Sequence, residues 1–160
     1  YAARCGARLM GEAEVITSGS RPILLMHGDS LCTDDIGYQE FRSLVRQPAW
    51  QAEFLGQPLE ARHAFAAQAR AQSREATSFK ANEIMDVNQA AVLQALVQHG
   101  VCDLLHGHTH RPSVHEFAFG GLTGESEQPA TRTVLGDWET SAWFAQIHAG
   151  EISLIKYNFQ

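Results

Sequence analysis

Apolar residues near the start of the chain follow the pattern of two adjacent strands. Residues 14–29 predict two strands around a Ser-Gly-Ser turn, and the second contains an unbroken apolar run from Ile23 to Met26. Such a run is typical of a strand that is covered on both faces of a sheet. We therefore expect this strand to lie inside the protein.

Helical spacing dominates the middle of the chain. Residues 34–48, 58–80 and 84–100 predict helices, and the last has the clearest boundaries. Asp86 stands where an N-cap would cap this helix, and Gly100 stands where a C-terminal glycine belongs. We interpret the helices at about 34–80 as an insertion that forms a cap.

Strands follow the last helix, and they complete an α/β pattern. They are predicted at 101–105, 113–119 and 131–138, and 141–159 predicts a hairpin around Ala149 and Gly150. Strand–helix–strand order followed by several strands indicates a layered α/β fold. The N-terminal part supplies too few strands for a complete two-sheet sandwich.

Length and composition narrow the class of protein. A chain of 160 residues predicts one domain, here 1–160, which is large enough to bury a core. Twelve basic and eighteen acidic residues give a net charge of −6, which argues against a nucleic-acid partner. Three scattered cysteines indicate a reducing compartment. We expect no membrane-spanning segment and no signal peptide, because no apolar run is long enough.

Two histidine motifs follow predicted strands. "LLHGHTHRP" places His106, His108 and His110 at every second position, and "LLMHGDS" places His27 after the earlier strand. If the backbone after the strand stays extended, His108 and His110 face the same side. Parallel strands ending side by side would bring His27 to them, and imidazole with carboxylate suits Mn²⁺, Fe²⁺ or Zn²⁺.

Polar residues next to these motifs could hold the metal-binding histidines in place. We expect Asp29 and His106 to orient the metal ligands from behind. The remaining histidines stand alone in the sequence, and we interpret them as structural or solvated: His63, His99, His115 and His148.

These motifs resemble those of the calcineurin-like metallophosphoesterase superfamily, whose last two blocks match His27 and Gly107–His110. The stretches "HGDSLCTDDIGYQEFR", "SFKANEIMDVNQ", "HGHTHRPSVHE" and "VLGDW" resemble the UDP-2,3-diacylglucosamine diphosphatase family of lipid A synthesis. The resemblance implies an αββα sandwich that holds two Mn²⁺ ions beneath a helical cap. In this chain the implied sandwich is a partial one. It also implies hydrolysis of the pyrophosphate bond of UDP-2,3-diacylglucosamine to UMP and 2,3-diacylglucosamine 1-phosphate.

The resemblance implies roles for individual residues. His27, His108 and His110 look like metal ligands, and His108 also lies beside the substrate phosphate as the candidate catalytic residue. Thr77 stands where family members more often carry Asn. Several residues of the predicted cap look like substrate contacts: Asp35, Tyr38, Arg70, Ser73, Thr77 and Lys80. Five aromatic and leucine side chains between Pro48 and Phe65 are expected either to wall an acyl-chain groove or to form a packed helix interior: Trp50, Phe54, Leu55, Leu59 and Phe65.

The implied lipid substrate indicates a cytoplasmic protein on the inner face of the bacterial inner membrane, where the cap could rest on the membrane surface.

The family's D-x-H and G-N-H/R motifs are absent, so the chain resembles the C-terminal part of the family domain. We therefore expect little activity from this chain alone. Two alternatives stay open: another metallophosphoesterase activity (phosphodiesterase or phosphatase), and a non-catalytic fragment with half a metal site. The sequence does not indicate an oligomeric state.

Overall fold

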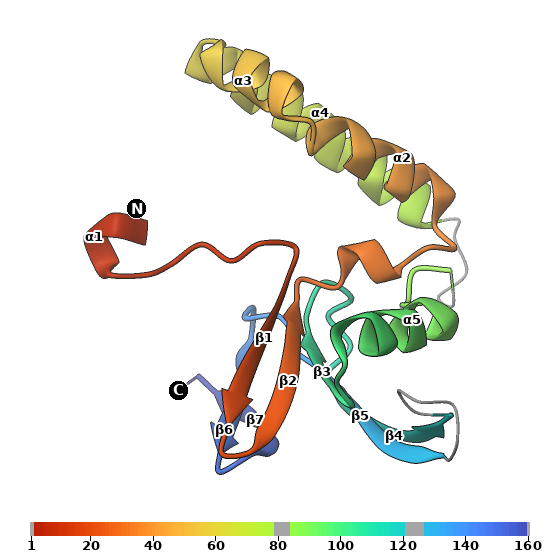
Figure 1. Ribbon diagram of the computed structural model, residues 1–160. Helices are drawn as coiled ribbons and strands as arrows, with labels where there is room; N and C mark the ends of the chain where they lie inside the picture. Colours follow the sequence, from red (N-terminus) through yellow and green to blue (C-terminus); the bar gives the residue numbers. More distant parts are fainter. Residues whose placement is uncertain (1, 79–83, 121–126, 160) are drawn as a thin grey trace. The chain divides into compact units, whose positions relative to one another are not determined.

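A computed structural model describes residues 2–78, 84–120 and 127–159 (Figure 1). The chain divides into two compact units, of which the first contains 1–31 and 88–160 and the second contains 32–87. The first unit holds the strands and one long helix, and the second is helical. The α/β class predicted from the sequence is confirmed.

The first unit is built on a five-stranded mixed sheet in the order β1-β2-β3-β5-β4. Its strands are β1 (Ala13–Ser18), β2 (Arg21–Met26), β3 (Asp103–His106), β4 (Ser113–Phe119) and β5 (Gln128–Val134). The three central strands, β2, β3 and β5, run parallel, whereas β1 and β4 are antiparallel edge strands. The carboxyl ends of the central strands therefore meet at one edge of the sheet.

Burial explains the parallel centre of this sheet. Ile23 and Leu24 of the apolar run on β2 are fully buried, whereas its other two residues, Leu25 and Met26, are half buried. Leu104 on β3 is also fully buried. The helix α5 (Gln89–His99) contributes three further buried side chains to the core of this unit: Val92, Ala95 and Leu96.

The two ends of α5 can be compared with the capping residues predicted from the sequence. Gly100 takes the left-handed conformation with φ 67°, as expected for a residue that ends a helix. The expected N-cap was wrong: the side chain of Asn88, rather than Asp86, accepts hydrogen bonds from the backbone N–H groups of Ala90 and Ala91. The Asp86 carboxylate instead accepts from the N–H of Val87, so the helix begins later than predicted.

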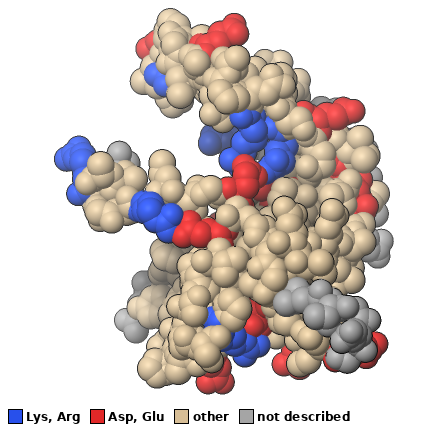
Figure 2. Space-filling view, in the orientation of Figure 1, with Lys and Arg blue, Asp and Glu red and all other residues tan. Residues whose placement is uncertain are grey.

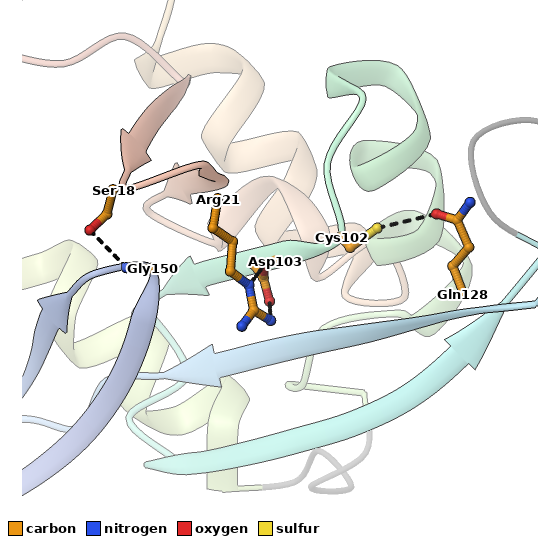
Figure 3. A network of polar contacts seen from close by, with 6 residues as sticks. All are labelled: Ser18, Arg21, Cys102, Asp103, Gln128 and Gly150. Atoms are coloured by element: carbon orange, nitrogen blue, oxygen red, sulfur yellow. Dashed lines mark hydrogen bonds and ion pairs between the residues drawn. The ribbon is translucent and has the colours of Figure 1, made fainter.

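A second, two-stranded sheet is formed by β6 (Ser141–His148) and β7 (Glu151–Asn158). Both turn residues, Ala149 and Gly150, have positive φ, which is typical of a tight hairpin turn and confirms the predicted hairpin. The N–H of Gly150 donates to the Ser18 hydroxyl over 3.1 Å (Figure 3). The two hairpin turns therefore lie against each other.

The end of the sheet away from the histidine motifs is tied by polar side chains. Arg21 on β2 donates two hydrogen bonds to the Asp103 carboxylate on β3, one of them over 2.6 Å (Figure 3). Asp103 is buried while Arg21 stays half exposed, and the carboxylate raises the pKa of Arg21 above its usual value. This pair links the two parallel strands at that end of the sheet.

The second unit consists of α2 (Ile36–Val45), α3 (Pro48–Gly56) and α4 (Leu59–Ser78). The expectation that the first helix extends to Pro48 is corrected, because Pro48 occupies the first turn of a separate helix, where its missing N–H costs nothing. The role of these helices as a cap stays a prediction. In the described part of the chain, no helix is long and apolar enough to cross a membrane.

Candidate functional site

The turns that follow β2 and β3 bring two histidines together. β2 and β3 pair in parallel with Met26 opposite His106, as predicted for the two motifs. The rings of His27 and His108 lie edge to face with their centroids 5.0 Å apart. Two imidazoles from distant parts of the sequence are thus neighbours at the carboxyl edge of the sheet.

A buried carboxylate lies behind one of these rings. Asp29, in the 3₁₀ turn Asp29–Leu31, is 2% exposed, and its Oδ1 lies 3.1 Å from Nδ1 of His27. When His27 is neutral, its Nδ1–H donates to this carboxylate and leaves the Nε2 lone pair available. Carboxylates orient metal-binding histidines in this way, and this role of Asp29 stays a prediction.

The backbone around His108 and His110 is not extended, which corrects one expectation. Both residues have positive φ, 65° and 54°, a conformation that L-residues other than glycine rarely adopt. A hydrogen bond of 2.8 Å from the N–H of Thr109 to the carbonyl of Gly107 closes the turn. This turn, rather than strand alternation, sets the directions of the two histidines. Strained backbone of this kind is concentrated at functional sites.

His110 has a different neighbour. Its side chain is exposed, and its Nδ1 lies 3.8 Å from Oδ2 of Asp137, beyond hydrogen-bond distance but within reach of an ion pair. Asp137 follows β5 in the "VLGDW" stretch, and its place beside a histidine turn was not predicted. The parallel order of β3 and β5 produces this proximity, so the sequence carried no local signal for it.

The donor chemistry of His27 and His108 suits a divalent transition metal. Among the residues that the structure describes, however, no group of three or more His, Cys, Asp or Glu side chains is arranged to hold a metal ion. The structure therefore brings together two adjacent imidazoles with a carboxylate beside one of them, and metal binding by these residues stays a prediction.

A buried arginine near the same turns was also missed. Arg132 on β5 is 7% exposed, and its Nη1 lies 3.3 Å from Nε2 of His106, which is 1% exposed. An arginine within the strand pattern "ATRTVL" was the available signal, because cations are rarely buried without a specific partner.

The predicted substrate contacts lie in the helical unit. Asp35 is buried at the N-cap of α2, where its carboxylate accepts the backbone N–H of Tyr38 over 3.1 Å, and Tyr38 is half buried. Arg70 and Ser73 are exposed three residues apart on α4, so they share one face of this helix. Thr77 belongs to α4, but its side chain and the whole of Lys80 lie outside the described residues.

An aromatic cluster forms between α3 and α4. Trp50 stacks on Phe54 with ring centroids 5.0 Å apart, and Phe65 contacts both rings. The cluster borders a hollow of about 250 Å³ that Glu53 and Gln57 complete. Leu55 and Leu59, which were assigned to the same wall, are instead largely exposed. The rings pack on one another but none is fully buried, so the helix interior and the acyl-chain groove both stay predictions.

Charged side chains do not form one continuous surface on the face drawn in Figure 2. Lys and Arg and Asp and Glu lie there in small groups separated by uncharged residues. This pattern accompanies the net charge of −6.

Comparison with known proteins finds relatives that match nearly the whole chain. No family model matches the chain. Curated proteins named "UDP-2,3-diacylglucosamine hydrolase" from Escherichia fergusonii and two strains of Escherichia coli are 46% identical to it over 159 residues. The match covers 99% of this chain and 64% of each relative, so the chain spans less than two thirds of their length. The resemblance seen in the motifs is therefore confirmed as similarity to UDP-2,3-diacylglucosamine hydrolases along nearly the whole chain.

Proposed function

We propose that this chain forms part of a metal-dependent hydrolase that cleaves the pyrophosphate bond of UDP-2,3-diacylglucosamine. The observation that carries the proposal is the pair of neighbouring rings, His27 and His108, with Asp29 behind one of them. The name of its relatives supplies the substrate. The products are UMP and 2,3-diacylglucosamine 1-phosphate.

The chemistry requires water to attack an anionic phosphorus while an oxygen–phosphorus bond breaks. Divalent ions such as Mn²⁺, two in the complete site, would lower the charge repulsion and the pKa of the attacking water. In this chain, His27 and His108 offer imidazole nitrogens, and we assign His110 to the same ligand set. We assign His108 a second role, stabilising the phosphate oxygen on which charge develops.

The helical unit provides candidate contacts to the rest of the substrate. Arg70 and Ser73 share an exposed face, on which a guanidinium and a hydroxyl suit phosphate and sugar oxygens. Asp35, Tyr38, Thr77 and Lys80 complete the proposed set. The hollow beside Trp50 and Phe54 suits an acyl chain, because three of its five lining residues are aromatic.

The proposed substrate also suggests a location. It is a membrane lipid, and the helical unit exposes large apolar side chains at Phe41, Leu44, Leu55 and Leu59. Exposed apolar residues of this kind can enter the interfacial region of a bilayer. We propose that the protein works in the cytoplasm at the surface of the inner membrane.

The test compares UMP release from UDP-2,3-diacylglucosamine by two proteins in the presence of Mn²⁺. One is this chain, and the other is a hybrid that adds the part of the Escherichia fergusonii relative that the chain does not match. We expect the hybrid to release UMP and the chain alone to release little. In the hybrid, His108→Ala should lower the rate about 100-fold or more. His148→Ala should leave it unchanged, because His148 lies at the β6–β7 turn.

Two results would contradict the proposal in different ways. Faster hydrolysis of bis(p-nitrophenyl) phosphate than of the lipid substrate would indicate another metallophosphoesterase activity. A folded hybrid that hydrolyses neither compound would indicate that the matched segment is non-catalytic.

A further inference from the structure

A buried arginine contacts the histidine that begins the "HGHTH" motif. Arg132 and His106 lie on the adjacent parallel strands β5 and β3 and are almost fully buried. The guanidinium Nη1 lies 3.3 Å from His106 Nε2. A guanidinium only donates hydrogen bonds, so Nε2 accepts and carries no proton.

The other nitrogen of the same ring faces a backbone carbonyl. Nδ1 of His106 lies 2.9 Å from the carbonyl oxygen of Gly107. Since a carbonyl oxygen only accepts, Nδ1 carries the proton. Together the two contacts specify one state of the ring, the neutral imidazole protonated on Nδ1.

Both histidine turns rest against this ring. A Cβ atom built on Gly28 would lie 2.7 Å from Nδ1 of His106, so the turn that follows His27 packs directly on the ring. The Gly107 N–H donates to the His27 carbonyl over 3.0 Å and joins the two turns. The His106 ring therefore contacts the turn of His27 and the turn of His108 together.

We propose that Arg132 is a positioning residue that, through His106, holds the turns of His27 and His108 in their metal-binding arrangement. The metal-binding part rests on the proposed function, whereas the effect on ring state and turn geometry does not. Residues that orient metal ligands from behind typically change metal affinity about 10- to 100-fold when they are replaced. We expect an effect of this size for Arg132.

The first measurement is the ring state of each histidine, from two-bond ¹H–¹⁵N spectra of this chain at a fixed pH. We expect the Nδ1–H state at His106, its loss in Arg132→Met, and its retention in Arg132→Lys, which keeps a donor for Nε2. The ring signals of His27 and His108 should shift in Arg132→Met. Arg21→Met is the matched control, because it removes an arginine paired across β2 and β3 at the other end of the sheet.

Replacing His106 separates its two contacts. In His106→Asn the amide N–H stands near the former Nδ1–H, so the bond to the Gly107 carbonyl can be kept. In His106→Gln the amide reaches toward Arg132 instead. We expect both variants to shift the His27 and His108 signals, because each loses one of the two contacts of the ring. Arg132→Met should cause no further shift when it is added to His106→Asn, because Arg132 acts through the ring.

The second measurement is the dissociation constant for Mn²⁺, obtained by electron paramagnetic resonance on the same proteins. Arg132→Met should raise it about 10- to 100-fold, while Arg132→Lys and Arg21→Met should stay within about threefold of the parent.

The inference is overturned if Arg132→Met leaves the His106 ring state and the His27 and His108 signals unchanged. It is also overturned if either His106 variant leaves those signals as in the parent chain, or if Arg132→Met shifts them as much in His106→Asn as in the parent. If the ring signals move as expected but the hybrid hydrolyses no substrate, the positioning role stands and the hydrolase proposal fails. If Arg132→Met does not fold, Arg132→Lys and the two His106 variants decide the outcome.

Discussion

The rings of His27 and His108 are neighbours, with centroids 5.0 Å apart, because β2 and β3 run parallel and end at the same edge of the sheet. Each of the two histidines lies in a turn that contains a glycine, Gly28 or Gly107. A hydrogen bond from the Gly107 N–H to the His27 carbonyl joins the two turns. The pair is therefore a product of strand pairing rather than of local sequence.

Removing the carboxylate behind His27 should weaken metal binding without removing a ligand. We expect Asp29→Asn to raise the Mn²⁺ dissociation constant about tenfold, because the amide no longer presents an anionic acceptor to Nδ1. His27→Ala should have a larger effect, since it removes the ligand itself. Titration calorimetry with Mn²⁺ measures both. Equal affinities in the parent chain and His27→Ala would exclude His27 as a ligand.

Gly28 should tolerate substitution much less well than Gly107. Gly28 has a φ of 104°, and a Cβ atom there would clash with the His106 ring, so Gly28→Ala should destabilise the fold by about 1–3 kcal/mol. A Cβ on Gly107 meets no atom closer than 3.9 Å, which makes Gly107→Ala the matched control. Urea unfolding followed by circular dichroism gives both values. A Gly28→Ala variant as stable as the parent would show that the close packing on His106 is dispensable.

The Arg21–Asp103 pair should contribute more to stability than the pair of Arg8 and Glu14, in which Arg8 is largely exposed. Arg21→Met leaves the buried Asp103 carboxylate without its cation and should cost about 1–2 kcal/mol, a modest value because Arg21 itself is half exposed. Arg8→Met should have little effect, since water replaces the lost contact. Urea midpoints of the three proteins check this. A larger loss for Arg8→Met would reverse the expected ranking.

Exposed leucines of the helical unit should promote binding to lipid bilayers. We expect the double variant Leu44→Ser and Leu55→Ser to bind about tenfold more weakly to vesicles of phosphatidylethanolamine and phosphatidylglycerol, because each leucine would lose apolar contact with the lipid. Val97→Ser on α5 is the control, since Val97 is similarly exposed in the other unit. Vesicle co-sedimentation measures the bound fraction. Unchanged binding by the double variant would argue against membrane contact through these leucines.

Sequence patterns predicted most of the elements in the first unit, because their signals are local. The apolar run from Ile23 to Met26, the glycine that ends α5 and the turn at Ala149 and Gly150 each state a preference within a few residues. The N-cap of α5 was assigned wrongly because Asp86 and Asn88 are both suitable capping residues. Which of them caps depends on where the chain enters the helix, and the hydrogen bond from the Asn88 N–H to the Leu31 carbonyl fixes that entry.

The sequence by itself determined the chemistry available to this protein: histidines after buried strands, an acidic residue beside one of them, and basic residues on a long helix. Only the tertiary structure decided how these groups meet. The left-handed turn at His108 and His110, the contact between Arg132 and His106 and the approach of Asp137 to His110 all arise where parallel strands end together. The sequence around each of these residues shows no pattern that predicts such contacts, because strand pairing and burial create them.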